Sequence, residues 1–334
     1  MMHIDTQPLL SRVAEAVYWT ARYIERAENV ARYIGVNLAL QLDLPLEPAS
    51  QWQPLIDTSG DTEAFAKRYG EATQSNVIEF LAYDSRNHNS IYSCLRAARE
   101  NARSIRETIG SEMWEQINSL YLRVSAQREK PAVDWPADVF GSIRLGCHLF
   151  QGIADATMTH NEAWHFLRLG RKLERADQTS RILDVKFFML LPSLGDVGTP
   201  YDDILWSAVL KSVSGFEMYR KKYGRIEPNQ IVEFLVMDRE FPRAIHFCIR
   251  HADESLHQIT GTPMGAFGTS SEQLMGRLRS ELDFASVEGI IDQGLHEYLD
   301  ALQTRISLIG ESLVSDFIAP QPQQYATRAR GVRG

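Results

Sequence analysis

RYIERAENVAR, residues 22–32, returns later in the chain as RKLERADQTSR, residues 171–181. A polar residue that occurs in both copies needs a reason that holds in both places. The two stretches therefore predict an internally duplicated protein in which the Glu-Arg segments occupy matching positions. The residues that keep type and order, at a shift of 149 positions, are Arg22, Glu25, Arg26, Ala27 and Arg32, followed by Arg171, Glu174, Arg175, Ala176 and Arg181.

A second set of matches extends the repeat at a shift of 154 positions. The five-residue increase indicates an insertion near residues 192–200. We predict a first copy at about 9–159 and a second at about 160–318, followed by a polar and basic tail at 321–334. The further matches pair Lys67-Arg68-Tyr69-Gly70 with Lys221-Lys222-Tyr223-Gly224, and Glu79-Phe80-Leu81 with Glu233-Phe234-Leu235.

Apolar residues recur at spacings of three and four along almost the whole chain, which is the helical period. Runs with strict two-residue alternation are missing, so no sheet is expected. We predict an all-α fold, an internally duplicated helical bundle whose two halves pack as one unit. Pro45 and Pro48 are expected to end the first helix. The expected helices span residues 9–42, 61–83, 89–127, 137–158, 161–191, 201–224, 228–260, 271–284 and 286–317, some with internal breaks.

Composition narrows the class of protein. The 334 residues carry a net charge of −8, which argues against a nucleic-acid-binding groove. No run of about 18 uncharged apolar residues occurs, so no membrane span is expected. The three cysteines form no CxxC pair, and Cys94 and Cys248 fall at matching apolar positions. An odd number of cysteines with no CxxC pair argues against a disulfide framework and indicates a reducing compartment, so we expect a cytoplasmic protein.

The Glu-Arg segments place polar and apolar residues on opposite faces of a helix. Neighbours in sequence point apart on a helix, so Glu25 and Arg26 are not expected to bond each other. The expected partners lie three or four residues away. They are Arg22 with Glu25, Glu25 with Asn29, and Glu28 with Arg32.

Three interpretations of this polar face remain open. It could be a solvated surface, a structural seam in which Arg and Glu satisfy each other between the halves, or a site for an anionic ligand. Spacing alone does not decide among them. The candidate residues for the seam or the ligand site are Arg22, Glu25, Arg26, Arg32, Arg171, Glu174, Arg175 and Arg181.

Several long motifs resemble the bacterial alpha-E family, a helical domain named for its Glu-Arg motif. The match runs from about Leu9 to Phe317. The motifs are AVYWTARYIERAE (16–28), NHNSI (87–91), ARENAR (98–103), SEMWE (111–115), WHFL (164–167), GRKLERA (170–176), and Asp238 with FPR (241–243).

The resemblance implies an all-helical fold and a gene neighbourhood rather than an activity. Family members sit beside, or are fused to, circularly permuted ATP-grasp proteins, and often lie near transglutaminase-like proteins. This setting implies a role in ATP-dependent amide-bond formation or peptide tagging. No catalytic residues carry over from the family. No ATP-grasp segment is found in this sequence, so any ligase chemistry is expected in a partner.

Motifs for other chemistries are missing. The sequence lacks both phosphate-binding glycine loops, the HExxH zinc motif and the GxSxG elbow, so no cofactor is predicted. Glu162 with His165 and Glu254 with His257 have the Glu-x-x-His spacing of di-iron bundles. These pairs do not fall at matching repeat positions, so no metal site is predicted.

Three functions follow from these observations. The first is an accessory helical module that docks on an ATP-grasp partner, with no catalytic role of its own. The second is an enzyme of the same pathway, in which Glu25 or Glu174 acts as a base while Arg26 and Arg175 hold an anionic group. The third, which the sequence supports least, is a di-metal oxidoreductase of the bundle type.

Overall fold

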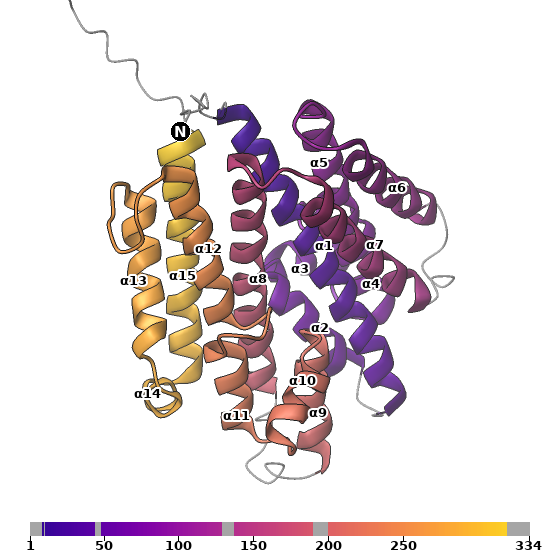
Figure 1. Cartoon of the computed structure of the whole chain (residues 1–334). Helices are drawn as coiled ribbons and strands as arrows, with labels where there is room; N and C mark the ends of the chain where they lie inside the picture. The colour runs from indigo at the N-terminus through magenta and orange to yellow at the C-terminus, as the bar shows by residue number, and fades with distance from the viewer. Residues whose placement is uncertain (1–8, 10, 44–47, 129–136, 190–199, 319–334) are drawn as a thin grey trace, which may run out of the picture.

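The computed structural model describes residues 9, 11–43, 48–128, 137–189 and 200–318. Over these ranges the chain is helical and contains no strand, which confirms the predicted all-α class (Figure 1). The predicted tail at 321–334 and the predicted insertion near 192–200, apart from Pro200, lie outside the described residues. The α-helices are α1 (Ser11–Asp43), α2 (Pro48–Ser59), α3 (Thr62–Tyr69), α4 (Gln74–Ile78), α5 (Ile91–Ser104), α6 (Ser111–Arg128), α7 (Ala137–Thr157), α8 (Glu162–Met189), α9 (Pro200–Ser212), α10 (Phe216–Tyr223), α11 (Pro228–Val232), α12 (Ile245–Thr260), α13 (Ser270–Phe284), α14 (Val287–Gln293) and α15 (Leu295–Leu313).

Four of the predicted helices, those observed as α1, α7, α8 and α13, begin and end within about two residues of the expected bounds. Helix α1 ends before both prolines, as predicted, but no helix was predicted over residues 43–60. Instead Pro48 is the first residue of α2, a position where its missing N–H costs nothing and its fixed φ suits a helix. The predicted helix at 89–127 is interrupted before Ser111, so it forms α5 and α6.

Short π-helical segments interrupt the regular pattern at Glu79–Tyr83 (η1), Glu233–Met237 (η3) and Val314–Ile318 (η4). Asp84 follows η1 and Asp238 follows η3, both in an extended conformation. Each carboxylate accepts a backbone N–H two residues further on. These contacts end the helix and turn the chain toward α5 and α12 respectively.

Helices α1 and α8 lie side by side in the middle of the molecule (Figure 1). Helices α5 and α7 pack on α1, and α6 packs on α5 and α7. Helices α12 and α15 pack on α8, and α13 packs on α12 and α15. Both central helices are therefore surrounded by other helices. Most of the polar face of α1 is therefore buried, and only Arg22 and Arg26 on this face are partly exposed.

The two central helices approach closely at Gly170. A Cβ atom on this residue would lie 2.5 Å from the carbonyl oxygen of Tyr18. Only glycine lets the α1 and α8 backbones come this near, and the contact fixes the height at which the two helices face each other.

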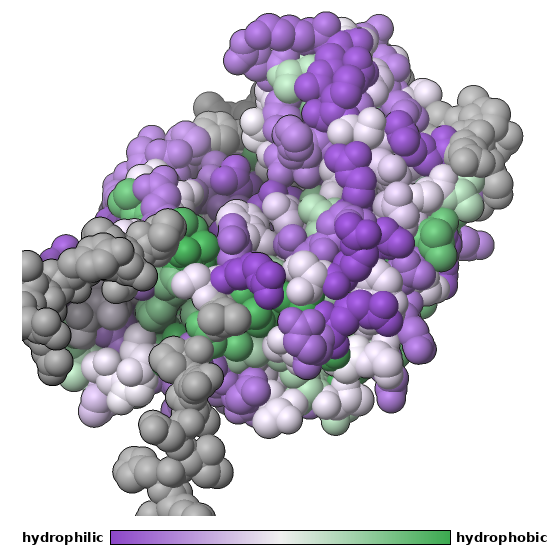
Figure 2. Space-filling view, turned by 90° about the horizontal axis from the view of Figure 1, so that it is seen from above, coloured by the Kyte–Doolittle hydropathy of each residue, from purple (hydrophilic) through white to green (hydrophobic). Residues whose placement is uncertain are grey.

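Trp52 and Trp206, which lie 154 residues apart in the sequence, are both buried, and so are all three free cysteines. None of the described helices is both long and apolar enough to cross a lipid bilayer. Figure 2 shows one face of the molecule, which is mostly hydrophilic, with hydrophobic residues to the left of and below its middle and a smaller group near its right edge.

Candidate functional site

The Glu-Arg residues of α1 and α8 bond across the helix interface rather than within each helix. Arg175 donates from Nε and Nη2 to the two oxygens of Glu25, at 2.6 and 2.8 Å. Arg26 donates from Nε and Nη2 to the two oxygens of Glu174, at 2.6 and 3.0 Å. The glutamate of each helix therefore bonds the arginine of the other helix instead of the arginine next to it in sequence. We call these two bidentate contacts the crossed pairs.

Glu25 lies in the more deeply buried of the crossed pairs. Its carboxylate is fully buried and accepts two further hydrogen bonds, from Arg243 Nη1 at 3.3 Å and from Gln151 Nε2 at 2.8 Å. Gln151 also accepts from Arg175 Nη2, at 3.3 Å, which ties α7 to the same contact. Every side of this carboxylate is thus supplied with a donor.

Glu174 is also fully buried, but its arginine partners are closer to the surface. Arg22 Nε donates to Glu174 at 2.8 Å, and the side chains of Arg22 and Arg26 are 14% and 19% exposed. Arg26 Nη1 also donates to Asn89 at 2.6 Å, just before α5. The guanidinium of Arg22 lies over the ring of Trp19, 5.2 Å from its centroid.

The surroundings keep both glutamates ionised. Burial alone would raise the pKa of Glu25, but the attraction of Arg175 and Arg243 outweighs it and holds the pKa well below 4.5. Burial opposes the same shift at Glu174, where Arg26 and Arg22 lower the pKa to about 2. Carboxylates with such low pKa values are weak proton acceptors at neutral pH.

A second group of charges continues along α1 from Glu25. Glu28 contacts Arg32 on the same helix, and it accepts from Arg243 Nη2 at 2.8 Å. Arg243 also donates to Asn29 at 3.0 Å. We call Glu25, Glu28, Arg32, Arg175 and Arg243 the α1 charge cluster.

Three guanidiniums share two carboxylates in the α1 charge cluster. Burial and the neighbouring Arg243 hold the pKa of Arg32 well below its ordinary value. Burial and Arg175 lower the pKa of Arg243 to about 10. His148 lies 3.3 Å from Glu28, and burial with Arg32 lowers the pKa of this histidine to about 4. The cluster therefore holds one positive charge in excess.

The two remaining candidates, Arg171 and Arg181, contact aspartates and take no part in the crossed pairs. Arg171 contacts Asp155 of α7 at 3.4 Å, and Arg181 bonds Asp177 one turn back on α8 at 2.9 Å. The Arg181 contact has the same four-residue spacing as that of Arg32 with Glu28.

Burial of the glutamates rules out the solvated-surface interpretation of the polar face. The expected pairing of Arg22 with Glu25 is wrong, because Arg22 bonds Glu174 instead. The expected contact of Glu25 with Asn29 forms only through the Glu25 backbone carbonyl. The expected contact of Glu28 with Arg32 is confirmed. Helix spacing could not predict the first two, because an interhelical partner was closer.

Sequence reasoning missed three members of the network, namely Arg243, Gln151 and Asn89. Arg243 lay within one of the family motifs, and it follows Asn89 by 154 residues, the shift of the predicted second set of matches. The difference between an amide and a cation at these two positions was a signal that could have been used. Gln151 carried no pattern in the sequence.

Glu162 and His257, one residue from each Glu-x-x-His pair, contact other groups. Glu162 accepts the backbone N–H of Leu9, while His257 lies between Asp253 and Glu272 at 3.6 and 3.7 Å. Across the described part of the chain, no group of three or more His, Cys, Asp or Glu residues is arranged to hold a metal ion.

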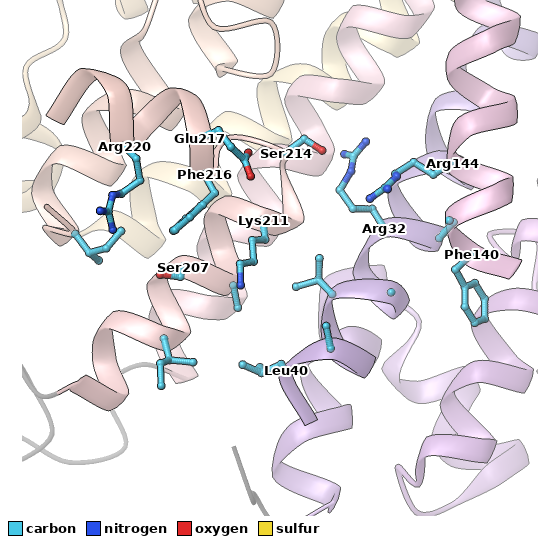
Figure 3. Close-up of a pocket in the computed structure, with 18 of the residues that line it drawn as sticks. Arg32, Leu40, Phe140, Arg144, Ser207, Lys211, Ser214, Phe216, Glu217 and Arg220 are labelled. Atoms are coloured by element: carbon cyan, nitrogen blue, oxygen red, sulfur yellow. The ribbon is translucent and has the colours of Figure 1, made fainter. Parts of the chain in front are cut away.

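A cavity of about 610 Å³ opens next to the α1 charge cluster, between α1, α7, α9 and α10 (Figure 3). Arg32 and Arg144 extend toward each other at one wall, while Lys211, Phe216 and Arg220 lie at the opposite wall. A smaller cavity of about 260 Å³ lies beside Arg26 and Arg181.

The fold and the crossed pairs define a class of protein: an all-helical domain whose two central helices are joined by buried Glu-Arg ion pairs. The chain belongs to the Alpha-E family, described as a predicted alpha-helical domain with a conserved ER motif, and the family model matches residues 9–318. This confirms the resemblance found in the sequence.

Two relatives carry only the description "uncharacterized protein". A protein of Mycobacterium bovis is 22% identical over 341 residues, covering 92% of this chain and 37% of its own length. A protein of Mycobacterium tuberculosis is 21% identical over 341 residues with the same coverage. The chain thus spans little more than a third of the length of these relatives. No solved structure matches.

Proposed function

We propose that this chain is a helical accessory module that docks on an ATP-grasp protein and serves ATP-dependent amide-bond synthesis or peptide modification in the cytoplasm. In this proposal the partner carries the ligase chemistry. A transglutaminase-like protein is a further component of the same system.

The observation that carries the proposal is the internal pairing of the Glu-Arg residues. Glu25 and Glu174 are the only acids of the motif itself, and arginines from the facing helix occupy both oxygens of each. Their lowered pKa values make them poor general bases, which weighs against the pathway-enzyme alternative. The motif is then a structural seam that sets the register of α1 against α8.

The size of the relatives supports a function shared with another polypeptide segment. In both mycobacterial proteins the matching region is 37% of the chain, so more than half of each of these longer proteins consists of additional sequence. The family setting beside or fused to ATP-grasp proteins gives that additional segment a chemical class. We extend the same association to a separate partner here.

We also infer that the chain arose by duplication of one unit, with copies at about 9–159 and 160–318. Support comes from features at the shifts seen in the sequence. The crossed pairs exchange equivalent residues, η1 and η3 each precede an aspartate that ends the helix, and Gly70 and Gly224 end α3 and α10 with positive φ. In this inference α1 and α8 are equivalent helices of the two copies, and the crossed pairs join them.

The proposal is tested by co-expressing the full chain with a circularly permuted ATP-grasp protein of the kind that accompanies the family, followed by gel filtration. We expect co-elution at micromolar concentration and an altered ATP turnover by the partner. Separate elution of the two proteins, with unchanged turnover, would refute the proposal.

Variants on α7 sharpen this experiment. Leu145 and Leu149 lie four residues apart on one face of α7 and are 63% and 55% exposed. We expect Leu145→Ser with Leu149→Ser to weaken co-elution. Leu308→Ser on α15, where the leucine is 45% exposed, is the matched control and should leave co-elution unchanged.

A further inference from the structure

The cavity between α1, α7, α9 and α10 has a buried cation at its inner wall. Arg32 is only 1% exposed yet lines the cavity. Its Nη2 atom contacts Glu28, but its Nε–H has no hydrogen-bond partner among the described residues. A buried donor without a partner costs free energy, and more so when it carries charge. This atom therefore marks a place where an acceptor is missing.

The other three cations that line the cavity, Arg144, Lys211 and Arg220, form no ion pair with a described carboxylate. Arg144 is half-buried, and it forms no ion pair with any described residue. On the opposite wall, Lys211 and Arg220 lie over the ring of Phe216, at 5.6 and 5.9 Å from its centroid, and no described carboxylate pairs with them. The cavity lining thus carries four basic side chains against the two acids Asp203 and Glu217.

We propose that this cavity is a binding site for a small organic oxyanion, whose carboxylate or phosphate group lies between Arg32 and Arg144. The head group would accept from the free Nε–H of Arg32 and neutralise the positive charge that the α1 charge cluster holds in excess. Lys211 and Arg220 would attract a second negative group, and Phe216 with Ile204 offers apolar contact to the body of the ligand.

The size and the charges of the cavity agree with this class of ligand. A volume of about 610 Å³ lies in the range of small-molecule sites. The smaller cavity provides a contrast within the same molecule. There Arg26 bonds Glu174 and Arg181 bonds Asp177, so both of its arginines already have a carboxylate. The excess of cations belongs to the larger cavity. The inference rests on this geometry and does not depend on the docking partner.

The test is calorimetric titration of the full chain with inorganic phosphate and with glutarate, each at matched ionic strength. These two probes separate a phosphate head group from a carboxylate head group. We expect saturable binding of at least one probe. Arg144→Gln should weaken it about tenfold, because a charged hydrogen-bond donor is lost.

Arg123→Gln is the matched control, since Arg123 is an exposed arginine on α6 away from the cavity, and it should leave binding within about twofold. Lys211→Gln on the opposite wall is a second variant, in case Arg144→Gln lowers the yield of folded protein. The inference is overturned if neither probe binds up to about 10 mM, or if the two cavity variants bind as well as the control.

Discussion

Replacing Glu25 with glutamine tests whether the crossed pairs hold the fold together. Glu25 is fully buried and accepts four hydrogen bonds, from Arg175, Arg243 and Gln151. Glutamine keeps the shape but turns one acceptor into an NH₂ donor that faces guanidinium donors. It also leaves both arginines buried without their shared counter-charge. Removing one partner of a buried pair costs about 3–5 kcal/mol, and we expect this loss in the free energy of unfolding.

The measurement is urea unfolding followed by circular dichroism at neutral pH. Glu174→Gln is the internal comparison, because Arg22 and Arg26 are 14% and 19% exposed and can be hydrated when their partner is lost. We therefore expect the Glu25 variant to be the less stable of the two. A loss below about 1 kcal/mol for Glu25→Gln, or the reverse order, would contradict the structural role.

A double-mutant cycle then isolates the pair itself. If Glu25 bonds Arg175 as the structure has it, Arg175→Gln added to Glu25→Gln costs less than the two single losses combined. The coupling should be about 1–3 kcal/mol, as for contacting residues in one network. Simple additivity would mean that the two side chains act independently, and would exclude the crossed arrangement.

The other predictions concern pH, packing and a buried amine. The pKa of Glu174 falls from 4.5 to about 2 on folding, so the stabilisation by its carboxylate is present above pH 4.5 and is lost as the pH drops toward 2. The urea concentration at the unfolding midpoint should therefore decrease as the pH is lowered through this range, and it should decrease less in Glu174→Gln. Gly170→Ala should lower stability by about 1–3 kcal/mol in the same assay because of its clash with α1, whereas Gly152→Ala on α7, with no atom within 4 Å of the added Cβ, should raise it by about 0.5 kcal/mol. Burial lowers the pKa of Lys172 from 10.5 to about 8, so the unfolded state binds more protons than the folded state between these pH values, and the parent protein gains stability as the pH rises. Lys172→Met should be more stable than the parent in urea at pH 8, and this difference should shrink as the pH is raised toward 10.5.

Much of the fold follows from local patterns. The helical period located α1, α7, α8 and α13 because each is long enough for its apolar stripe to exceed chance. The start of α2 at Pro48 was missed because proline both ends one helix and begins the next. Sequence alone could not tell these two uses apart without the position of the neighbouring helices.

The site was only half predictable, and for a physical reason. The residue types and the matching of Glu25 with Glu174 could be read from the sequence. Their partners could not, because a helical wheel ranks only neighbours on the same helix. Bidentate geometry across α1 and α8 outweighs an intrahelical contact, since an arginine fork satisfies both carboxylate oxygens at once.

The two crossed pairs have different neighbours, and this difference distinguishes the residues that fix the helix register from those that we assign to ligand binding. Asn89 is neutral and completes the Arg26 contact, whereas Arg243 at the shifted position adds a cation beside Glu25 and Glu28. Register between α1 and α8 needs only the crossed pairs, which are balanced charge for charge. A surplus buried guanidinium contributes nothing to that register and costs free energy unless an anion compensates it. Because the surplus borders a cavity with further unpaired cations, ligand binding accounts for it where packing does not.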